Sequence, residues 1–339
     1  MTGPTEHTTV HTHVVSAPVE VAYGLIADVE RWPVIFEPTV HVRMLERSDG
    51  AERFRIWALV NGEVASWTSR RTLDPRAAVI TFRQEHSRPP LTSMGGEWRF
   101  TPLPGNRTEI ALTHTFSAEG DDDVEWITRA LDTNSERELA ALGRMAEQRH
   151  PVQDLVMTFE DVVRAEGDTA RAYRFVDRAD AWPTLLPHVA RLDLDEPEPG
   201  VQHMEMDTLT SDGSTHTTRS VRLCFPEREI VYKQELPPRL LFGHSGAWEF
   251  GEDGLITARH TVAIDPGAVA GVLGEGATVA QAREYLRSAL GANSRTTLTH
   301  AAAAAGSGTG DAEAGAGDAG DAGDAEPGAA GRSVRGRAS

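Results

Sequence analysis

Cysteine and long hydrophobic runs are scarce in this chain of 339 residues. Cys224 is the only cysteine, so no intrachain disulfide can form, and a reducing, cytoplasmic location is expected. No apolar stretch approaches the roughly 20 residues that cross a bilayer. The N-terminus has no basic region followed by an apolar run. We therefore expect no membrane span and no signal peptide.

Basic residues are also few: 33 Lys and Arg stand against 51 Asp and Glu, and the formal net charge is −18. Nucleic-acid backbones require clustered Lys and Arg, so this balance argues against a nucleic-acid partner.

Motifs for metal, nucleotide or nucleophilic chemistry are missing as well. The glycines of 271–276 lack both the context and the Lys-Ser/Thr ending of a phosphate loop, and we expect a loop there. His7, His11 and His13 have a spacing that suits a metal, but they lie near the N-terminus, where an incidental role at a frayed end is expected. The sequence predicts no metal and no cofactor.

One long segment occurs twice. Several matching residues lie 150 positions apart: Trp32 and Trp182, Gln84 and Gln234, Trp98 and Trp248. His114 and His260 are 146 apart, and Asn134 and Asn293 are 159 apart. A period this long predicts two whole domains, 1–150 and 151–305. The tail, 306–339, is mostly Gly, Ala and Asp, and we expect it to be disordered.

Each copy shows the same order of elements. A strand (8–15) precedes a short helix (19–27), a series of strands follows, and a long helix begins at 121. This pattern predicts an α+β domain in which one antiparallel sheet curls around its closing helix. Such a domain encloses space suited to a small molecule.

Two histidines share strand faces with apolar residues. His114 alternates in phase with Leu112 and Phe116, and His260 does so with Val262. A core histidine with a hydrogen-bond partner and a group for general acid–base catalysis both fit this placement.

Arginines supply the second signal. Arg71 shares a face with Trp67, so it needs either a ligand or a salt bridge, for which Glu85 and Glu97 are the candidates. With a ligand, it would stabilise an enolate or alkoxide. Arg222 is the nearest counterpart in the second copy, with Arg219 as its rival.

Several further residues are candidates for binding. Arg83 and Lys233 correspond between the copies, and their facing stays open. Asn134 and Asn293 lie on the closing helices, where they would hold a carbonyl or water, or simply face solvent. The tryptophans are typical of a core, and Trp67 alone is a candidate for lining the cavity.

Several of these motifs together resemble the aromatase/cyclases of bacterial type II polyketide synthases. They are Trp32-Pro33, the stretch 66–71, Arg83-Gln84-Glu85, Met94 before Trp98, and a Leu-x-x-Asn segment in the closing helix. The doubled module resembles the di-domain subclass over roughly 8–300.

The resemblance implies two tandem helix-grip domains of the START and Bet v 1 type, without metal or redox cofactor. It implies a poly-β-ketone substrate on an acyl carrier protein, other components of the synthase as partners, and first-ring aldol cyclisation followed by dehydration. Ring closure of the C7–C12 type, or aromatisation of a ring reduced at C9, is implied for the subclass. By position, Arg71 and Arg83 match cavity arginines, and Trp32, Trp67 and Met94 match lining positions.

The sequence also departs from the single-domain pattern. His114 stands where those enzymes carry Gln, Thr39 stands at the position of an aromatic hydroxyl, and both Asn134 and Glu138 lie near the position of the helix Asn. Two alternatives stay open: a polyketide- or lipid-binding protein of the same fold without catalysis, and an enzyme in which only one domain is catalytic.

Overall fold

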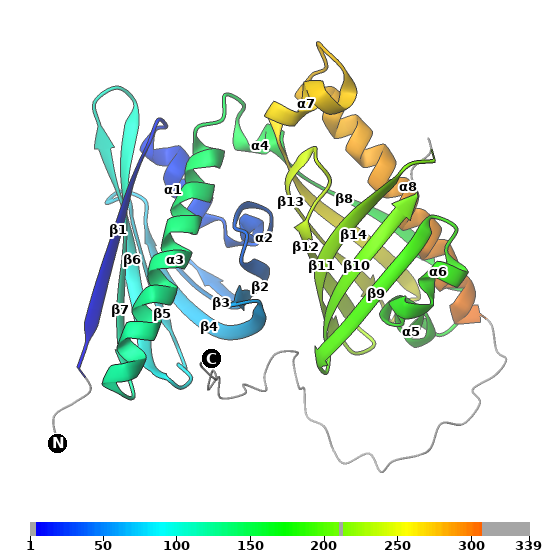
Figure 1. The fold of residues 1–339 in the computed structure, drawn as a ribbon, viewed down its shortest axis with the longest axis horizontal. Coiled ribbons are helices and arrows are strands. Elements are labelled where there is room, and N and C mark those ends of the chain that lie inside the picture. The colour runs from blue at the N-terminus through cyan, green and yellow to red at the C-terminus, as the bar shows by residue number, and fades with distance from the viewer. Residues whose placement is uncertain (1–4, 210–212, 307–339) are drawn as a thin grey trace, which may run out of the picture. The chain divides into compact units, whose positions relative to one another are not determined.

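The computed structural model describes residues 5–209 and 213–306 (Figure 1). Apart from its first residue, the tail predicted to be disordered lies outside the described residues. Internal contacts divide the chain between Val152 and Gln153 into two compact units, called domain one and domain two below.

Domain one is a seven-stranded antiparallel sheet with a long helix across one face (Figure 1). The strand order is β1-β7-β6-β5-β4-β3-β2, so the first strand pairs with the last. The strands are β1 His7–Val15, β2 Thr39–Ser48, β3 Ala51–Val60, β4 Glu63–Asp74, β5 Val79–Gln84, β6 Leu91–Leu103 and β7 Arg107–Ala118. The helices are α1 Val19–Ala27, the short η1 Val29–Arg31, α2 Trp32–Ile35 and α3 Asp121–Ala146.

Domain two repeats this plan, with the strand order β8-β14-β13-β12-β11-β10-β9. Its strands are β8 Val156–Arg164, β9 Val189–Glu198, β10 Val201–Leu209, β11 Thr215–Phe225, β12 Glu229–Leu236, β13 Leu241–Phe250 and β14 Leu255–Ile264. Its helices are α4 Val152–Leu155, α5 Thr169–Asp177, the short η2 Ala179–Ala181, α6 Trp182–Leu185, α7 Pro266–Leu273 and α8 Val279–Gly306. The predicted α+β class is confirmed in both domains.

The closing helix of domain one defines the inner face of its sheet. Acidic side chains occupy the first turn of α3, where they favour the positive end of the helix dipole. The helix packs chiefly on β1 and β7 and buries Leu139 and Leu142. Residues of β1 and β7 that point toward α3 are therefore positioned by both sheet and helix.

The predicted loop over 271–276 is only partly correct. Its first residues end α7, which begins where Asp265 accepts a hydrogen bond from the backbone N–H of Gly267 (2.8 Å) and Pro266 occupies the first turn. Gly274, with a φ of 99°, ends the helix. The Asp-Pro pair is a helix start signal that the sequence interpretation passed over.

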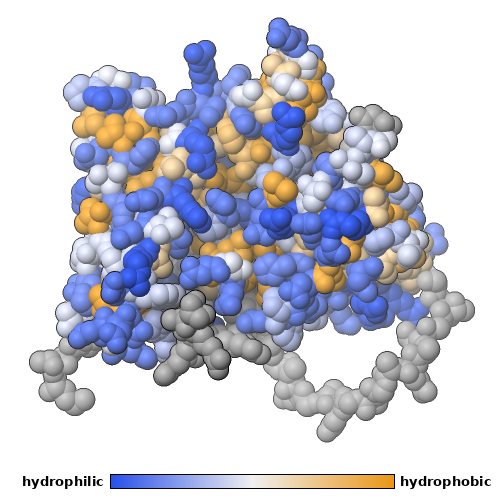
Figure 2. All heavy atoms as spheres, in the orientation of Figure 1, coloured by the Kyte–Doolittle hydropathy of each residue, from blue (hydrophilic) through white to orange (hydrophobic). Residues whose placement is uncertain are grey.

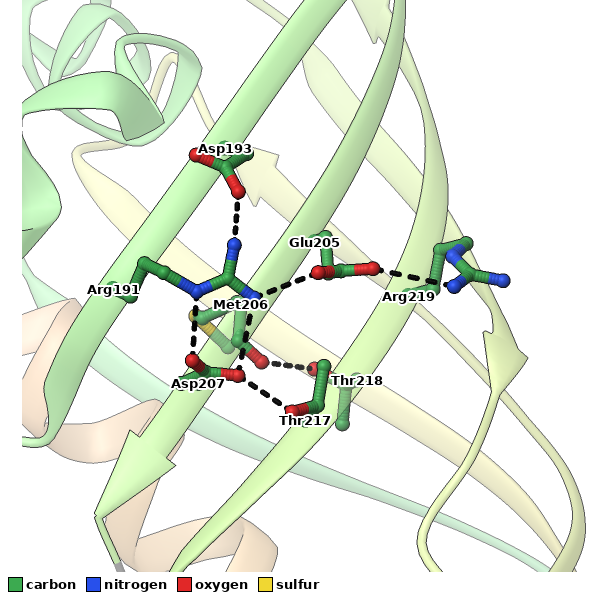
Figure 3. Close-up of polar contacts among 8 residues, drawn as sticks. All are labelled: Arg191, Asp193, Glu205, Met206, Asp207, Thr217, Thr218 and Arg219. Atoms are coloured by element: carbon green, nitrogen blue, oxygen red, sulfur yellow. Dashed lines mark hydrogen bonds and ion pairs between the residues drawn. The ribbon is translucent and has the colours of Figure 1, made fainter.

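Polar and charged residues predominate on the face shown in Figure 2. Figure 3 shows one cluster on β9, β10 and β11, where the Arg191 guanidinium contacts the carboxylates of Asp193, Glu205 and Asp207. Arg219 donates to Glu205 in the same cluster (3.2 Å). These contacts are solvent-exposed, so each adds little to stability. Among the described residues, no helix is long and apolar enough to span a membrane.

Candidate functional site

Arg71 is held at the inner face of domain one by an internal ion pair. Its Nε donates to Glu52 (2.7 Å), its Nη1 donates to the carbonyl oxygen of Ile26 (2.7 Å), and its Nη2 donates to Glu52 and to the carbonyl oxygen of Ala27. The side chain is 1% exposed. The predicted salt bridge to Glu85 or Glu97 is wrong, because Glu52 lies directly opposite Arg71 on β3. These contacts anchor α1 on the sheet and leave the guanidinium little capacity for a ligand.

Arg222 is the counterpart of Arg71 in domain two. Its Nη2 donates to the carbonyl oxygen of Val176 (2.6 Å), and its guanidinium lies over the Trp182 ring. Gln202 stands opposite it, at the place of Glu52. The rival Arg219 belongs to the exposed cluster of Figure 3. The domains thus share the buried arginine but differ in the charge of its neighbour on the next strand.

Arg83 and Lys233 do not lie on the inner faces. Phe82 and Tyr232 point inward, so alternation along β5 and β12 turns the next residue outward. Arg83 is exposed and lines a hollow of about 430 Å³ with Arg70 and Thr72. Arg71 lines the same hollow, so the role of Arg83 as a cavity arginine stays a prediction. Lys233 is buried, on the outward side of its strand.

The predicted lining residues belong to apolar clusters. Trp32 and Trp67 pack against a core that includes Phe54 and Ile56. Met94 packs with Phe116 and the first turns of α3. Their contacts are those of core residues at the edge of the inner face.

On the closing helices, serines next to the predicted asparagines are buried, and the asparagines are not. Asn134 and Asn293 are half-buried, whereas the next residues, Ser135 and Ser294, are buried. The Ser294 hydroxyl donates to Asp161 (3.1 Å). The Ser135 hydroxyl makes no hydrogen bond with the described residues.

His114 lies at the centre of several polar atoms without partners. Thr9 is its register partner on β1, and His114 contacts the Phe82 ring edge-on. Within the described residues, the Nδ1 of His114 and the hydroxyl of Thr9 are buried without a hydrogen bond. Burial, and secondarily the nearby charge of His11, lowers the pKa of His114 to about 4. The imidazole is therefore neutral near pH 7.

His11 lies beside this pair and belongs to β1, so the expectation of a frayed end is wrong. Its Nε2–H donates to Asp132 on α3 (2.9 Å), which leaves its buried Nδ1 without a partner among the described residues. Unpartnered buried polar atoms are rare in native structures, and they often mark ligand or water positions. Those of Thr9, His11, His114 and Ser135 all lie between β1, β7 and α3.

Glu138 contributes a carboxyl group from the same helix. It is half-buried on α3, and burial raises its pKa to about 7. A carboxyl group with this pKa exchanges protons readily at neutral pH. In the sequence it appeared only as a neighbour of the helix-Asn position.

Domain two has a connected polar chain at the equivalent place. The Tyr232 hydroxyl lies 2.8 Å from His260 Nδ1, and His244 Nε2 lies 3.1 Å from the same nitrogen. The other ring nitrogen of His244 is 2.8 Å from the side-chain oxygen of Gln234. Burial lowers the pKa of His260 to about 4 and that of His244 well below its ordinary value. His260 Nε2 is buried and unpartnered among the described residues.

The surroundings of His114 and His260 differ at two positions, and this difference is visible when the two copies of the sequence are aligned. Phe82 and Met94 in domain one correspond, at the 150-residue offset, to Tyr232 and His244. His114 and His260 each face a glycine, Gly96 or Gly246, across the neighbouring strand. Reading the copies against each other would have found Tyr232 and His244, which the sequence interpretation missed.

A second hollow, of about 500 Å³, lies between β8 and α8. Met157, Phe159, Arg287, Ser288 and Arg295 are among its lining residues. Arg287 and Arg295 also donate to Asp161. The described residues contain no group of three or more His, Cys, Asp or Glu side chains that would hold a metal ion.

Two seven-stranded sheets, each closed by a long helix and each carrying a histidine on its inner face, define a tandem helix-grip protein. Residues 15–134 match the family model described as polyketide cyclase/dehydrase and lipid transport. The chain is 56% identical over 314 residues to the actinorhodin polyketide synthase bifunctional cyclase/dehydratase of Streptomyces coelicolor, covering 89% of this chain and 98% of that protein. It is 55% identical to the granaticin counterpart of Streptomyces violaceoruber, covering 88% and 94%.

Two solved structures of di-domain proteins are also similar to this chain. The di-domain ARO/CYC BexL from the BE-7585A pathway has a TM-score of 0.76 at 45% identity, covering 89% of this chain and 99% of its own. The di-domain ARO/CYC StfQ from the steffimycin pathway has a TM-score of 0.72 at 39% identity, covering 88% and 98%. The chain belongs to the polyketide cyclase/dehydratase family, in its two-domain form, and is an enzyme of that family.

Proposed function

We propose that this enzyme closes and aromatises the first ring of a poly-β-ketone carried by an acyl carrier protein of a type II polyketide synthase. The ring closure is of the C7–C12 type, on a chain that is either unreduced or reduced at C9. The observation that carries this proposal is the group of unpartnered buried polar atoms around His114, in a chain whose relatives are named cyclase/dehydratases.

Ring closure and dehydration need a proton acceptor at carbon and a donor at oxygen. Methylene groups between two ketones are acidic, so a modest base suffices if the enolate oxygen is stabilised. Glu138, with its pKa raised to about 7, takes the proton from carbon. His114 stays neutral and donates an N–H to the ketone oxygen on which charge develops.

The carbanion then attacks the second ketone, and the alkoxide that forms takes up the proton held by Glu138. Loss of this hydroxyl as water, together with a proton from the carbon between the ketone and the hydroxyl carbon, then begins aromatisation of the ring. His11, oriented by Asp132, and Ser135 are placed to hold further oxygen atoms of the chain. Holding a flexible chain in one folded arrangement supplies the regiochemistry. Arg71 contributes by fixing α1 against the sheet.

Reconstitution with the minimal synthase and its acyl carrier protein tests this function. With the enzyme, the expected products contain an aromatic first ring, and without it the chain cyclises spontaneously into a mixture. Adding a ketoreductase shows whether the enzyme uses the unreduced or the C9-reduced poly-β-ketone, since only the preferred substrate is converted to new products. An unchanged product mixture under both conditions would refute catalysis and favour a binding protein of the same fold.

A further inference from the structure

The hydrogen bonds around His260 determine which of its nitrogens carries the proton. Gln234 presents its side-chain oxygen to His244 Nδ1, so that nitrogen must be the N–H of a neutral ring. His244 Nε2 is then a lone pair. It lies 3.1 Å from His260 Nδ1, and two lone pairs at that distance would repel each other. The Tyr232 hydroxyl lies 2.8 Å from His260 Nδ1 and 3.4 Å from His244 Nε2, so it can accept from a His260 Nδ1–H and donate to His244 Nε2. This arrangement favours a His260 ring with its proton on Nδ1 and a lone pair on Nε2.

This arrangement makes His260 Nε2 a prepared proton acceptor. It is buried and without a partner among the described residues, and the side chain is oriented through Nδ1 by His244 and Tyr232. When Nε2 takes a proton, the Nδ1–H bond to His244 helps to stabilise the imidazolium. In domain one, Met94 and Phe82 replace these partners, and the Nδ1 of His114 has none among the described residues. Within the described parts of the chain, this series of contacts is found in domain two and not in domain one.

Space for a ligand adjoins this histidine. The Phe159 ring stacks on the His260 ring, with centroids 5.0 Å apart, and it also lines the hollow of about 500 Å³. Arg287 lies over the same phenyl ring, 4.8 Å from its centroid. A planar or nearly planar ring compound that displaces Phe159 would meet His260 Nε2 on one side and the arginines on the other.

We propose that domain two is a second catalytic site, which dehydrates a ring already closed in domain one, with His260 as the base. The substrate is a cyclic β-hydroxy ketone. His260 Nε2 removes the proton between ketone and hydroxyl carbon, and the C–H electron pair moves to the ketone oxygen. The enolate re-forms the ketone as the carbon–oxygen bond breaks, and the departing hydroxyl takes the proton back from His260 and leaves as water.

This assignment rests on the proposed function, and the reconstituted synthase separates the two. The double variant Tyr232→Phe/His244→Met places domain one's own residues around His260, so the fold accommodates both side chains. We expect it to slow aromatisation about 10-fold, and His260→Asn to slow it about 100-fold. Both variants should accumulate a closed ring that keeps its hydroxyl, heavier than the aromatic product by one water.

His300→Gln is the matched control, since His300 lies on α8 of the same domain, hydrogen-bonds to the carbonyl oxygen of Thr296 on its own helix and stacks on the Phe175 ring. It should aromatise at the wild-type rate. Nitrogen-15 NMR should also show the Nδ1–H form of His260 in the wild type and a mixture of forms in the double variant. Wild-type aromatisation by both the double variant and His260→Asn would overturn the assignment. If the wild type itself redirects nothing, the proposed function fails instead.

Discussion

Replacing Glu52 by alanine is expected to lower the free energy of unfolding of domain one by about 3–5 kcal/mol. The side chains of Arg71 and Glu52 are 1% and 9% exposed, so removal of the carboxylate leaves a buried guanidinium charge without its counterion. Two backbone carbonyl oxygens would remain as partners. Hydrogen exchange of amides in β3 and β4 measures this loss within domain one, where a whole-chain melting curve would mix the two domains.

Domain two supplies the control for this experiment. Gln202 stands opposite Arg222, so a neutral amide is compatible with a buried arginine at this place in the fold. Glu52→Gln should therefore cost less, about 1–2 kcal/mol, because a hydrogen-bond acceptor remains. Amides of domain two should exchange as in the wild type. Equal losses for the alanine and glutamine variants would contradict a role for the charge.

The free energy of unfolding of domain two is expected to fall more steeply with decreasing pH than that of domain one. A histidine in an unfolded chain has a pKa near 6.5, whereas burial lowers the pKa of His260 in the folded domain to about 4 and that of His244 well below its ordinary value. Between these values the unfolded state binds more protons, so stability falls as the pH falls. Each such group contributes about 1.4 kcal/mol per pH unit between its pKa values in the folded and unfolded states, and in domain two the contributions of His260 and His244 add.

Domain one responds less because its groups oppose one another. His41 and His114 have pKa values lowered by burial to about 3 and about 4, and they act in the same direction as the histidines of domain two. Glu138 has a pKa raised to about 7, so the folded state binds its proton first and gains stability as the pH falls through that range. Denaturant titrations at several pH values, followed by hydrogen exchange in each domain, test this difference. His244→Met should make the slope of domain two shallower, and equal slopes in the two domains would refute the account.

Much of the fold follows from local pattern. Alternation along the strands, the duplicated tryptophans and the shared order of elements predicted a sheet closed by a helix in each copy, and the structure confirms this. The alternation also placed His114 and His260 on inner faces, where the structure has them. These features depend on residues close in sequence, so they can be predicted without knowledge of the tertiary structure.

Contacts between distant strands were harder to infer. Glu52 pairs with Arg71 because of the register between β3 and β4, which the sequence alone does not reveal. Arg83 was assigned to the cavity by resemblance, although the side chain of its neighbour Phe82 points to the inner face. His11 was dismissed as terminal, yet pairing of β1 with β7 fixes it beside α3. The chain around His260 joins residues from three strands, and only comparison of the two copies position by position would have indicated it.

The central claim is that the inner face of domain one closes the first ring with the help of His114. Its most direct test is the rate at which the reconstituted synthase forms closed first-ring product with the wild type and with His114→Leu, a variant that cannot donate a hydrogen bond. Leu112 already occupies the same face, so the fold should persist, as hydrogen exchange in β7 would verify. The account predicts a fall of about 100-fold, with spontaneous products taking over. Ring closure at the wild-type rate by a folded His114→Leu enzyme would contradict it.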